Sequence, residues 1–198
     1  MLFSLSLQME SLFLVCLIPP ADIVKDVDEI RKFISEKFNV HESLKRPAHI
    51  TLYDPLKLTS LNQENIFFQT LQNLAYFDPF KQVLKNFGSF NEHTFYIDVE
   101  QNENIMQLKK AIDSALKPLK LLNTKNHLKF TPHLTLAFKD VRPEVFRAIN
   151  IMFKDKRFKR EFIVSGFSVY KHIDKRWQPY QFIPFQSPDE RPRPLTLF

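Results

Sequence analysis

Apolar residues along this chain fall into two patterns. Short continuous apolar runs predict buried β-strands, whereas apolar positions that recur every three or four residues predict amphipathic α-helices. Residues 11–18 form a continuous run that ends at Pro19-Pro20, and residues 21–39 follow with helical spacing. We therefore expect the chain to open with a buried strand and an amphipathic helix.

The same order of elements returns in the second half of the chain. The first half is predicted to run strand, helix, strand, helix, strands, and the second half helix, strand, helix, strands. This repetition indicates an internal duplication whose copies have diverged. The strand at 48–53 is expected to end at Asp54-Pro55. The other strands are predicted at residues 80–90, 94–99, 129–138, 161–171 and 178–184, and the other helices at residues 62–76, 105–119 and 143–153.

Two of the predicted strands carry nearly the same motif. The sequences PAHITL and TPHLTL begin at residues 47 and 131, and each places a histidine two residues before a threonine. Side chains alternate between the two faces of a strand, so His49 and Thr51 share one face, as do His133 and Thr135. Each strand would then present an imidazole and a hydroxyl to one space. The alternative is two unrelated histidines, in the core or at a sheet edge.

This set of groups suits a reaction at a phosphodiester. Opening a cyclic phosphate requires a base to activate water, an acid to protonate the departing oxygen, and donors to the phosphoryl oxygens. Histidine has a pKa near 6.5, so one imidazole can be neutral while another is protonated, without a metal ion. The sequence does not determine which histidine is the acid and which is the base. Thr51 and Thr135 would donate hydrogen bonds to the nonbridging oxygens.

Other residues near the motifs are weaker candidates. Tyr53 lies four residues after the first histidine and is predicted to share its face, where it would contact phosphate or a base; an ordinary strand tyrosine is the alternative. Lys129 and Lys139 bracket the second motif and would add positive potential. Trp177 is a candidate base platform or a buried ring. The basic segment 154–160 is either an RNA-phosphate contact or a solvated connection.

Composition narrows the chemistry by exclusion. A formal net charge of +6 and a pI near 9.3 favour an anionic partner. With only two glycines, Gly88 and Gly166, the chain cannot build a glycine-rich phosphate loop or a dinucleotide-binding turn. The single cysteine, Cys16, excludes cysteine-based zinc sites and disulfides within the chain, and fits a reducing cytoplasm. We therefore expect no metal site and no cofactor.

The ends of the chain are expected to lie outside the folded unit. Residues 1–10 are read as an N-terminal extension. The apolar stretch at residues 1–20 is not read as a signal peptide, because it lacks a basic segment and is interrupted by Gln8, Met9 and Glu10. Residues 186–198 are read as a mobile tail. No apolar stretch approaches the roughly 20 residues of a membrane span. The expectation is a single domain at residues 11–185, in a cytoplasmic monomer that does not enter a membrane.

The chain resembles the 2H phosphoesterase superfamily, and within it the bacterial 2′-5′ RNA ligase-like group. Four features carry this resemblance: the paired motifs, their separation by close to half the chain, the opening strand that ends in Pro-Pro, and the late strand followed by an aromatic segment. The resemblance covers residues 11–185. It implies an α+β fold with two pseudo-symmetric lobes, each an antiparallel sheet flanked by helices, around a central cleft lined by both motifs.

The family resemblance also implies an activity. Members hydrolyse cyclic phosphodiesters or join RNA reversibly through 2′-5′ linkages, which would make His49 and His133 catalytic, with RNA ends or nucleotides as substrates. In the assignment that the resemblance suggests, His49 is the acid and His133 is the base. The alternative is a noncatalytic RNA- or nucleotide-binding protein that keeps the cleft. The physiological substrate and the direction of the reaction are not determined by the sequence.

Overall fold

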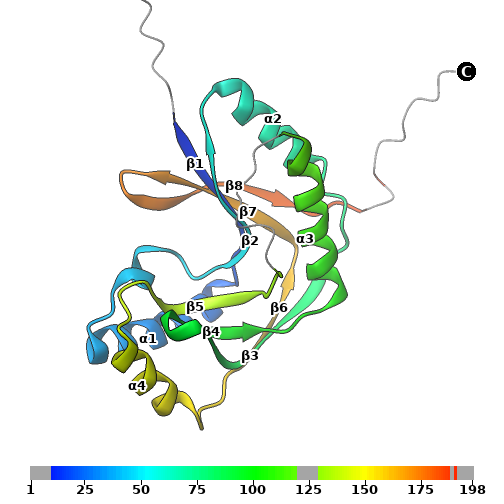
Figure 1. Ribbon diagram of the computed structural model, residues 1–198. Helices are drawn as coiled ribbons and strands as arrows, with labels where there is room; N and C mark the ends of the chain where they lie inside the picture. The colour runs from blue at the N-terminus through cyan, green and yellow to red at the C-terminus, as the bar shows by residue number, and fades with distance from the viewer. Residues whose placement is uncertain (1–9, 120–128, 188–189, 191–198) are drawn as a thin grey trace, which may run out of the picture.

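The computed structural model describes residues 10–119, 129–187 and 190. Its centre is one curled antiparallel sheet with the strand order β6-β3-β4-β5-β2-β1-β7-β8 (Figure 1). The strands are β1 Ser11–Leu17, β2 Ile50–Leu58, β3 Phe80–Phe90, β4 Thr94–Val99, β5 His133–Phe138, β6 Lys159–Val164, β7 Gly166–Ile173 and β8 Arg176–Pro184. The helices of the described residues are α1 Ala21–Phe38, α2 Leu61–Gln72, α3 Glu103–Leu116 and α4 Pro143–Phe153.

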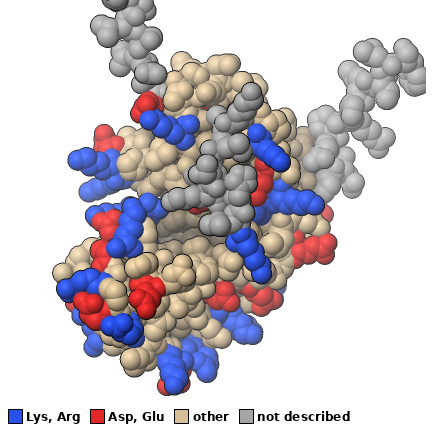
Figure 2. All heavy atoms as spheres, viewed as in Figure 1, with Lys and Arg blue, Asp and Glu red and all other residues tan. Residues whose placement is uncertain are grey.

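The sheet consists of two four-stranded halves that meet between β2 and β5. The described pairing between these strands is Ile50 with Leu134, so the junction is narrow. Helices α1 and α4 lie against the half that contains β3 to β6, and α2 and α3 lie against the other half (Figure 1). Figure 2 shows a hollow between the halves, with Lys and Arg side chains on both sides of it at the left of the view. The predicted α+β fold with two antiparallel halves is confirmed, although both halves belong to one sheet.

The helices tie the two halves together. Helix α1 precedes β2 in the chain but packs against β5, and α3 precedes β5 but packs against β2. The side chains that hold α1 are spaced as the sequence predicts, with Ile23, Val27 and Ile34 buried. Full burial of each such side chain contributes about 1.5–3 kcal/mol. Because each motif strand is covered by the helix that leads into the other one, the two motifs are held in one relative position.

Strand β2 continues beyond the point where the sequence predicts its end. Asp54 and Pro55 lie inside it, and the strand reaches Leu58. The pairing with β1 passes from Tyr53 to Leu56 with a register shift, so Asp54 and Pro55 fall at an irregularity of the ladder. A proline is tolerated at such a place because no ladder hydrogen bond requires its missing N–H.

The predicted strand at 161–171 is two strands in different halves of the sheet. Strand β6 pairs with β3 at one edge, whereas β7 pairs with β1 and β8 in the other half. The division falls at Gly166, where a Cβ atom would lie 2.4 Å from the carbonyl oxygen of Ile183. Only glycine permits this approach of β8. Both segments are apolar and extended, so the local pattern does not reveal the change of partner.

The predicted extension and tail lie almost wholly outside the described residues. The first residue of the predicted tail, Gln186, forms a bridge with Tyr76. Within residues 10–119, 129–187 and 190, none of the helices combines the length and the apolar character needed to cross a membrane.

Candidate active site

Both His-x-Thr motifs line one cavity of about 410 Å³ between the two halves of the sheet. The reason is the pairing of the motif strands, in which Ile50 of β2 lies opposite Leu134 of β5. These two residues are buried in the core, so the histidine and threonine that flank each of them face the opposite side. The structure thereby brings four of the sequence-predicted site residues together, namely His49, Thr51, His133 and Thr135.

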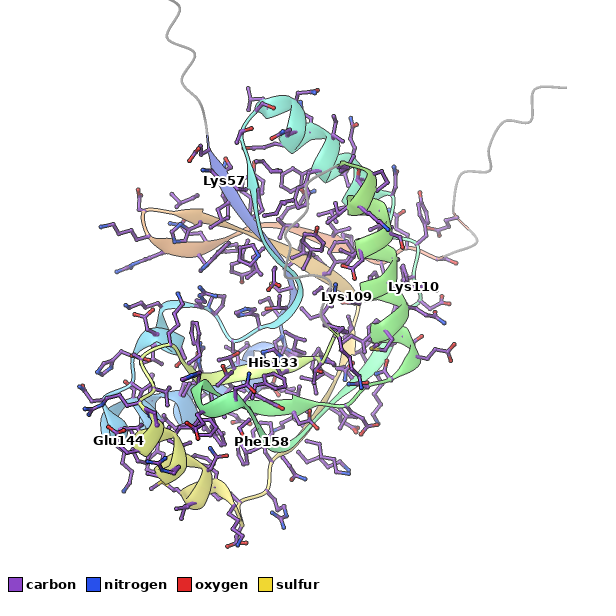
Figure 3. The ribbon with its side chains drawn as sticks, in the orientation of Figure 1. Lys57, Lys109, Lys110, His133, Glu144 and Phe158 are labelled. Atoms are coloured by element: carbon purple, nitrogen blue, oxygen red, sulfur yellow. The ribbon has the colours of Figure 1, made fainter. Side chains whose placement is uncertain are left out.

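The two imidazoles are held in the same way. The Nδ1 atom of His49 lies 2.7 Å from the carbonyl oxygen of Pro47, and the Nδ1 atom of His133 lies 2.9 Å from that of Thr131. A carbonyl oxygen only accepts, so each Nδ1 carries the proton and donates. Each Nε2 is then the ring atom left to exchange a proton with a ligand. Figure 3 shows His133 on β5 and Lys109 on α3, both near the centre of the molecule.

The surroundings of His49 favour its neutral form. The pKa of His49 is lowered to about 4, mainly by burial and also by the positive charges of Arg46 and Arg31, against the opposing effect of the hydrogen bond to Pro47. In the absence of a bound anion, the Nε2 atom of His49 is therefore unprotonated at neutral pH and can accept a proton.

The charged groups near His133 have the opposite sign from those near His49. Burial lowers the pKa of His133 as well, but the carboxylates of Asp54 and Asp98 oppose that decrease, as does the hydrogen bond to Thr131. The ring also packs edge-on against Phe90, at a centroid distance of 4.9 Å. The two histidines thus have matching hydrogen bonds but different neighbouring charges, and the carboxylates favour the protonated form of His133.

Arg31 of α1 is a buried cation at the cavity wall with protein partners. It is 3% exposed and donates to the carboxylate of Asp28 at 2.9 Å, to the carbonyl oxygen of Ser43, and to that of Arg46 at 3.0 Å. The last two carbonyls belong to the segment that enters β2. Arg31 therefore fixes the backbone just before His49, in addition to bringing positive charge to the cavity.

Lys109 of α3 is the counterpart of Arg31 in the other half. It is buried, forms an ion pair with Asp113, and lies 5.6 Å above the ring of Phe130. Each helix that leads into a motif strand thus contributes one cation to the cavity wall. Lys129 also lines the cavity, as the sequence suggested, whereas Lys139 is exposed beside Phe138.

Arg46 differs from Arg31 and Lys109 because its guanidinium group has no hydrogen bond or ion pair with any residue that the structure describes. It lies over two aromatic rings, 5.1 Å from that of Phe138 and 5.8 Å from that of Trp177. Among the described lining residues four are cationic, and Asp54 is the one carboxylate. The cavity therefore suits an anion. The described residues contain no group of three or more His, Cys, Asp or Glu arranged to hold a metal ion.

A β-bulge follows the threonine of each motif. Cys16 pairs with Thr51 and Val15 with Tyr53, so two steps along β2 match one step along β1, and Leu52 is the extra residue. On β5 the pairing passes in the same way from Thr135 to Ala137, with Leu136 as the extra residue. A bulge shifts the alternation of side chains by one position.

This shift removes Tyr53 from the cavity wall. The sequence prediction placed Tyr53 beside His49 by simple alternation, but the structure buries it in the core at 3% exposed. Asp54, one residue later, lines the cavity instead, and Phe138 does so at the matching position of the other motif. The regular period of two fails here because the bulge adds a residue that neither motif reveals.

Several lining residues were not predicted from the sequence. Four of them come from elements that only the folded chain places beside the motifs: Arg31, Phe90, Thr94 and Lys109. Phe130 directly precedes the second motif in the sequence. Rings of Phe90, Phe130 and Phe138 form apolar parts of the wall, which are surfaces suited to a nucleobase. No local pattern distinguishes these rings from core residues. The basic segment 154–160 lies elsewhere, where Lys156 covers the rings of Phe33 and Phe153.

Comparisons with known proteins show which fold the chain shares. The chain is similar to Escherichia coli LigT complexed with 3′-AMP, with a TM-score of 0.68, 16% identity, and coverage of 90% of this chain and 100% of that one. Its similarity to Thermus thermophilus TT0787 has a TM-score of 0.62 and 16% identity, and covers 89% of this chain and 98% of that one. Its similarity to a structure described as a phosphoesterase has a TM-score of 0.61 and 17% identity, and covers 90% of this chain and 100% of that one. These likenesses show the fold. A comparison with curated proteins finds no match. The model of the 2′-5′ RNA ligase superfamily matches residues 19–176, most of the chain, and the protein therefore belongs to that superfamily.

Proposed function

We propose that the protein is a phosphoesterase that opens 2′,3′-cyclic phosphates or cleaves 2′-5′ phosphodiester bonds at RNA ends or in nucleotides, without a metal ion. The observation that carries the proposal is the pair of imidazoles whose Nε2 atoms are left free for one positively charged cavity. The related E. coli LigT structures with 3′-AMP, ATP, NADP⁺ and phosphate support nucleotides as the class of ligand.

The charges around the histidines support one assignment of their roles in hydrolysis. The neutral Nε2 of His49 takes a proton from water as the water oxygen attacks phosphorus. The bond from phosphorus to the ribose oxygen breaks, and the Nε2–H of His133 gives its proton to that oxygen. Asp54 favours this protonated form of His133. This polarity is the reverse of our sequence interpretation, because the motifs are alike and the difference lies in their neighbours. Ligation to a cyclic phosphate would keep these roles, with a 5′-hydroxyl in place of water, whereas the reverse reaction, cleavage of a 2′-5′ bond by the neighbouring 3′-hydroxyl, would exchange them.

The remaining groups of the cavity bind the phosphoryl oxygens. The hydroxyls of Thr51 and Thr135 donate hydrogen bonds to nonbridging oxygens from the two sides, and the cations stabilise the negative charge that develops there. The bound anion also raises the pKa of both imidazoles, which helps His133 to hold its proton until the ribose oxygen leaves.

Substitution of either histidine tests the proposal. Because each performs a proton transfer, His49→Ala and His133→Ala are each expected to lower kcat about 10²- to 10⁴-fold. The measurement is hydrolysis of 2′,3′-cyclic AMP and of RNA that ends in a cyclic phosphate, in the presence of EDTA. His93→Ala is the matched control, because His93 is exposed and does not line the cavity.

The outcomes separate an enzyme from a binding protein. Turnover that survives both cavity substitutions would overturn the assignment of the site. If the unmodified protein binds these nucleotides without turnover on either substrate, the protein is instead a noncatalytic nucleotide-binding member of its superfamily.

A further inference from the structure

A stack of three side chains leads from the cavity to the surface. The guanidinium of Arg46 lies 5.1 Å from the ring of Phe138 and 5.8 Å from that of Trp177. Phe138 and Arg46 line the cavity, whereas Trp177, on β8, lies outside its wall. A ligand that extends from the reacting phosphate along this path therefore meets Trp177 beyond the cavity.

The guanidinium of Arg46, the middle member of this stack, has no hydrogen-bond or ion-pair partner among the described residues. Glu42, the carboxylate whose charge acts on Arg46, forms an ion pair with Lys45, and the guanidinium donors of Arg46 have no acceptor among the described residues. Burial between the two rings removes part of the hydration of this cation, which is unfavourable unless an anion replaces it. Arg31 and Lys109, by contrast, have carboxylate partners. Arg46 is thus the stacked cation that is available to a ligand.

The outer member of the stack is held by a tight hairpin. Trp177 pairs across the hairpin with His172 of β7, and their rings lie 5.2 Å apart. Asp174 and Lys175 form the turn with positive φ angles of 48° and 63°, the conformation of a two-residue hairpin turn that matches the twist of the strands. Lys175 and Arg176 are exposed beside the indole. An aromatic ring held among cations is the usual stacking surface for single-stranded nucleic acid.

We propose that Trp177 and Arg46 bind the second nucleotide of an RNA chain, counted from the nucleotide whose phosphate lies between the two histidines. The base stacks on the indole, and the guanidinium binds the phosphate that joins the two nucleotides. This inference rests on the proposed function, since it takes the cavity as the place of the reacting phosphate. It names the substrate class as RNA of two or more nucleotides in preference to a free cyclic nucleotide.

Fluorescence tests the binding directly, because Trp177 is the only tryptophan of the chain. The probe is an RNA tetranucleotide that ends in a 3′-phosphate, and the comparison ligand is 3′-AMP. Stacking of a base is expected to quench the emission when the tetranucleotide binds, whereas saturating 3′-AMP leaves it unchanged. The inference is overturned if the tetranucleotide binds without quenching, or if 3′-AMP quenches to the same extent.

This readout requires no turnover, so it separates the two proposals. Quenching by the tetranucleotide should persist in the His133→Ala variant. An unmodified protein that shows the quenching but hydrolyses nothing would disprove the proposed enzyme and retain the RNA subsite. A protein that hydrolyses cyclic phosphates but shows no quenching would retain the proposed enzyme and disprove the RNA subsite.

Kinetics provide a second, independent measurement. Trp177→Ala is expected to raise KM for a tetranucleotide with a cyclic phosphate end about tenfold, with little change in kcat, because one stacked base is lost. The matched control is Tyr180→Ala, which removes a ring on the same strand that is 49% exposed and packs against Phe13 and Phe68, and should leave KM unchanged. If Trp177→Ala raised KM for 2′,3′-cyclic AMP by the same factor, Trp177 would act in the inner cavity and the inference would be overturned.

Discussion

At the scale of single residues, two equivalent histidines differ because of what lies beside each of them. The hydrogen bonds from Nδ1 to a carbonyl two residues earlier are the same in both motifs. The cations near His49 come from α1 and the segment before β2, whereas Asp54 near His133 comes from the middle of β2, beyond the bulge. A duplicated site thus gains an acid side and a base side through neighbours that do not follow the duplication.

Removal of the Asp54 charge tests this polarity. Asp54→Asn is expected to lower the pKa of His133, because the carboxylate stabilises the imidazolium. If His133 is the acid in hydrolysis, the alkaline limb of the kcat/KM profile moves to lower pH as well. NMR titration of the imidazoles measures the first effect, with exposed Asp155→Asn as the control. A profile whose acidic limb moves instead would assign the base role to His133.

At the scale of elements, close packing within a strand pair positions the second histidine. Gly88 of β3 leaves room for the ring of Tyr96 of β4, and a Cβ atom there would lie 2.6 Å from that ring. Tyr96 in turn packs against Phe90 at 4.3 Å and against the His133 ring at 5.2 Å, measured between centroids. The orientation of His133 is therefore coupled to a glycine that does not line the cavity.

Gly88→Ala is expected to affect catalysis as well as stability. The added methyl group displaces the Tyr96 ring, destabilises the fold by about 1–3 kcal/mol, and lowers kcat more than it raises KM. Gly166→Ala is the matched control, because its Cβ atom would meet the β8 backbone away from the cavity. Urea denaturation and steady-state kinetics provide the two readouts. Unchanged kcat in a folded Gly88→Ala protein would exclude the coupling.

At the scale of the whole molecule, the cavity between the halves links stability to pH. His49 is buried there and its pKa is about 4, whereas an unfolded histidine titrates near 6.5. As pH falls through this window the unfolded chain takes up a proton before the folded protein does, so the free energy of unfolding decreases. The stability that comes from keeping His49 neutral is fully present above pH 6.5. The free energy of unfolding decreases by up to about 3 kcal/mol from this source by pH 4.

Replacement of His49 should remove this part of the pH dependence. His49→Gln has no titrating group, so its stability is expected to fall less between pH 6.5 and pH 4 than that of the unmodified protein. Urea unfolding at several pH values measures the slope, and His93→Gln, at an exposed position, is the control. The same slope in all three proteins would show that His49 does not titrate abnormally.

The sequence by itself determined the elements, the duplicated motifs and the positive charge. Strands at 80–90 and 94–99 and the helix at 143–153 match the structure, because hydrophobic period and chain punctuation act over a few residues. Local alternation also predicted that each histidine shares a strand face with the threonine of its own motif. The two motifs share one cavity only because Ile50 pairs with Leu134.

Only the tertiary structure decided what surrounds the motifs. The bulge in β2 places Asp54 in the cavity wall where simple alternation predicts Tyr53. Helix α1 brings Arg31 to the cavity, and the sheet brings Trp177 beside Arg46, and no spacing in the sequence predicts either position. The physical reason is that strand pairing joins residues far apart in the sequence, and one extra residue in a ladder reverses which side chains face a cavity. The motifs supply the reacting groups, and the fold supplies the charges that distinguish them.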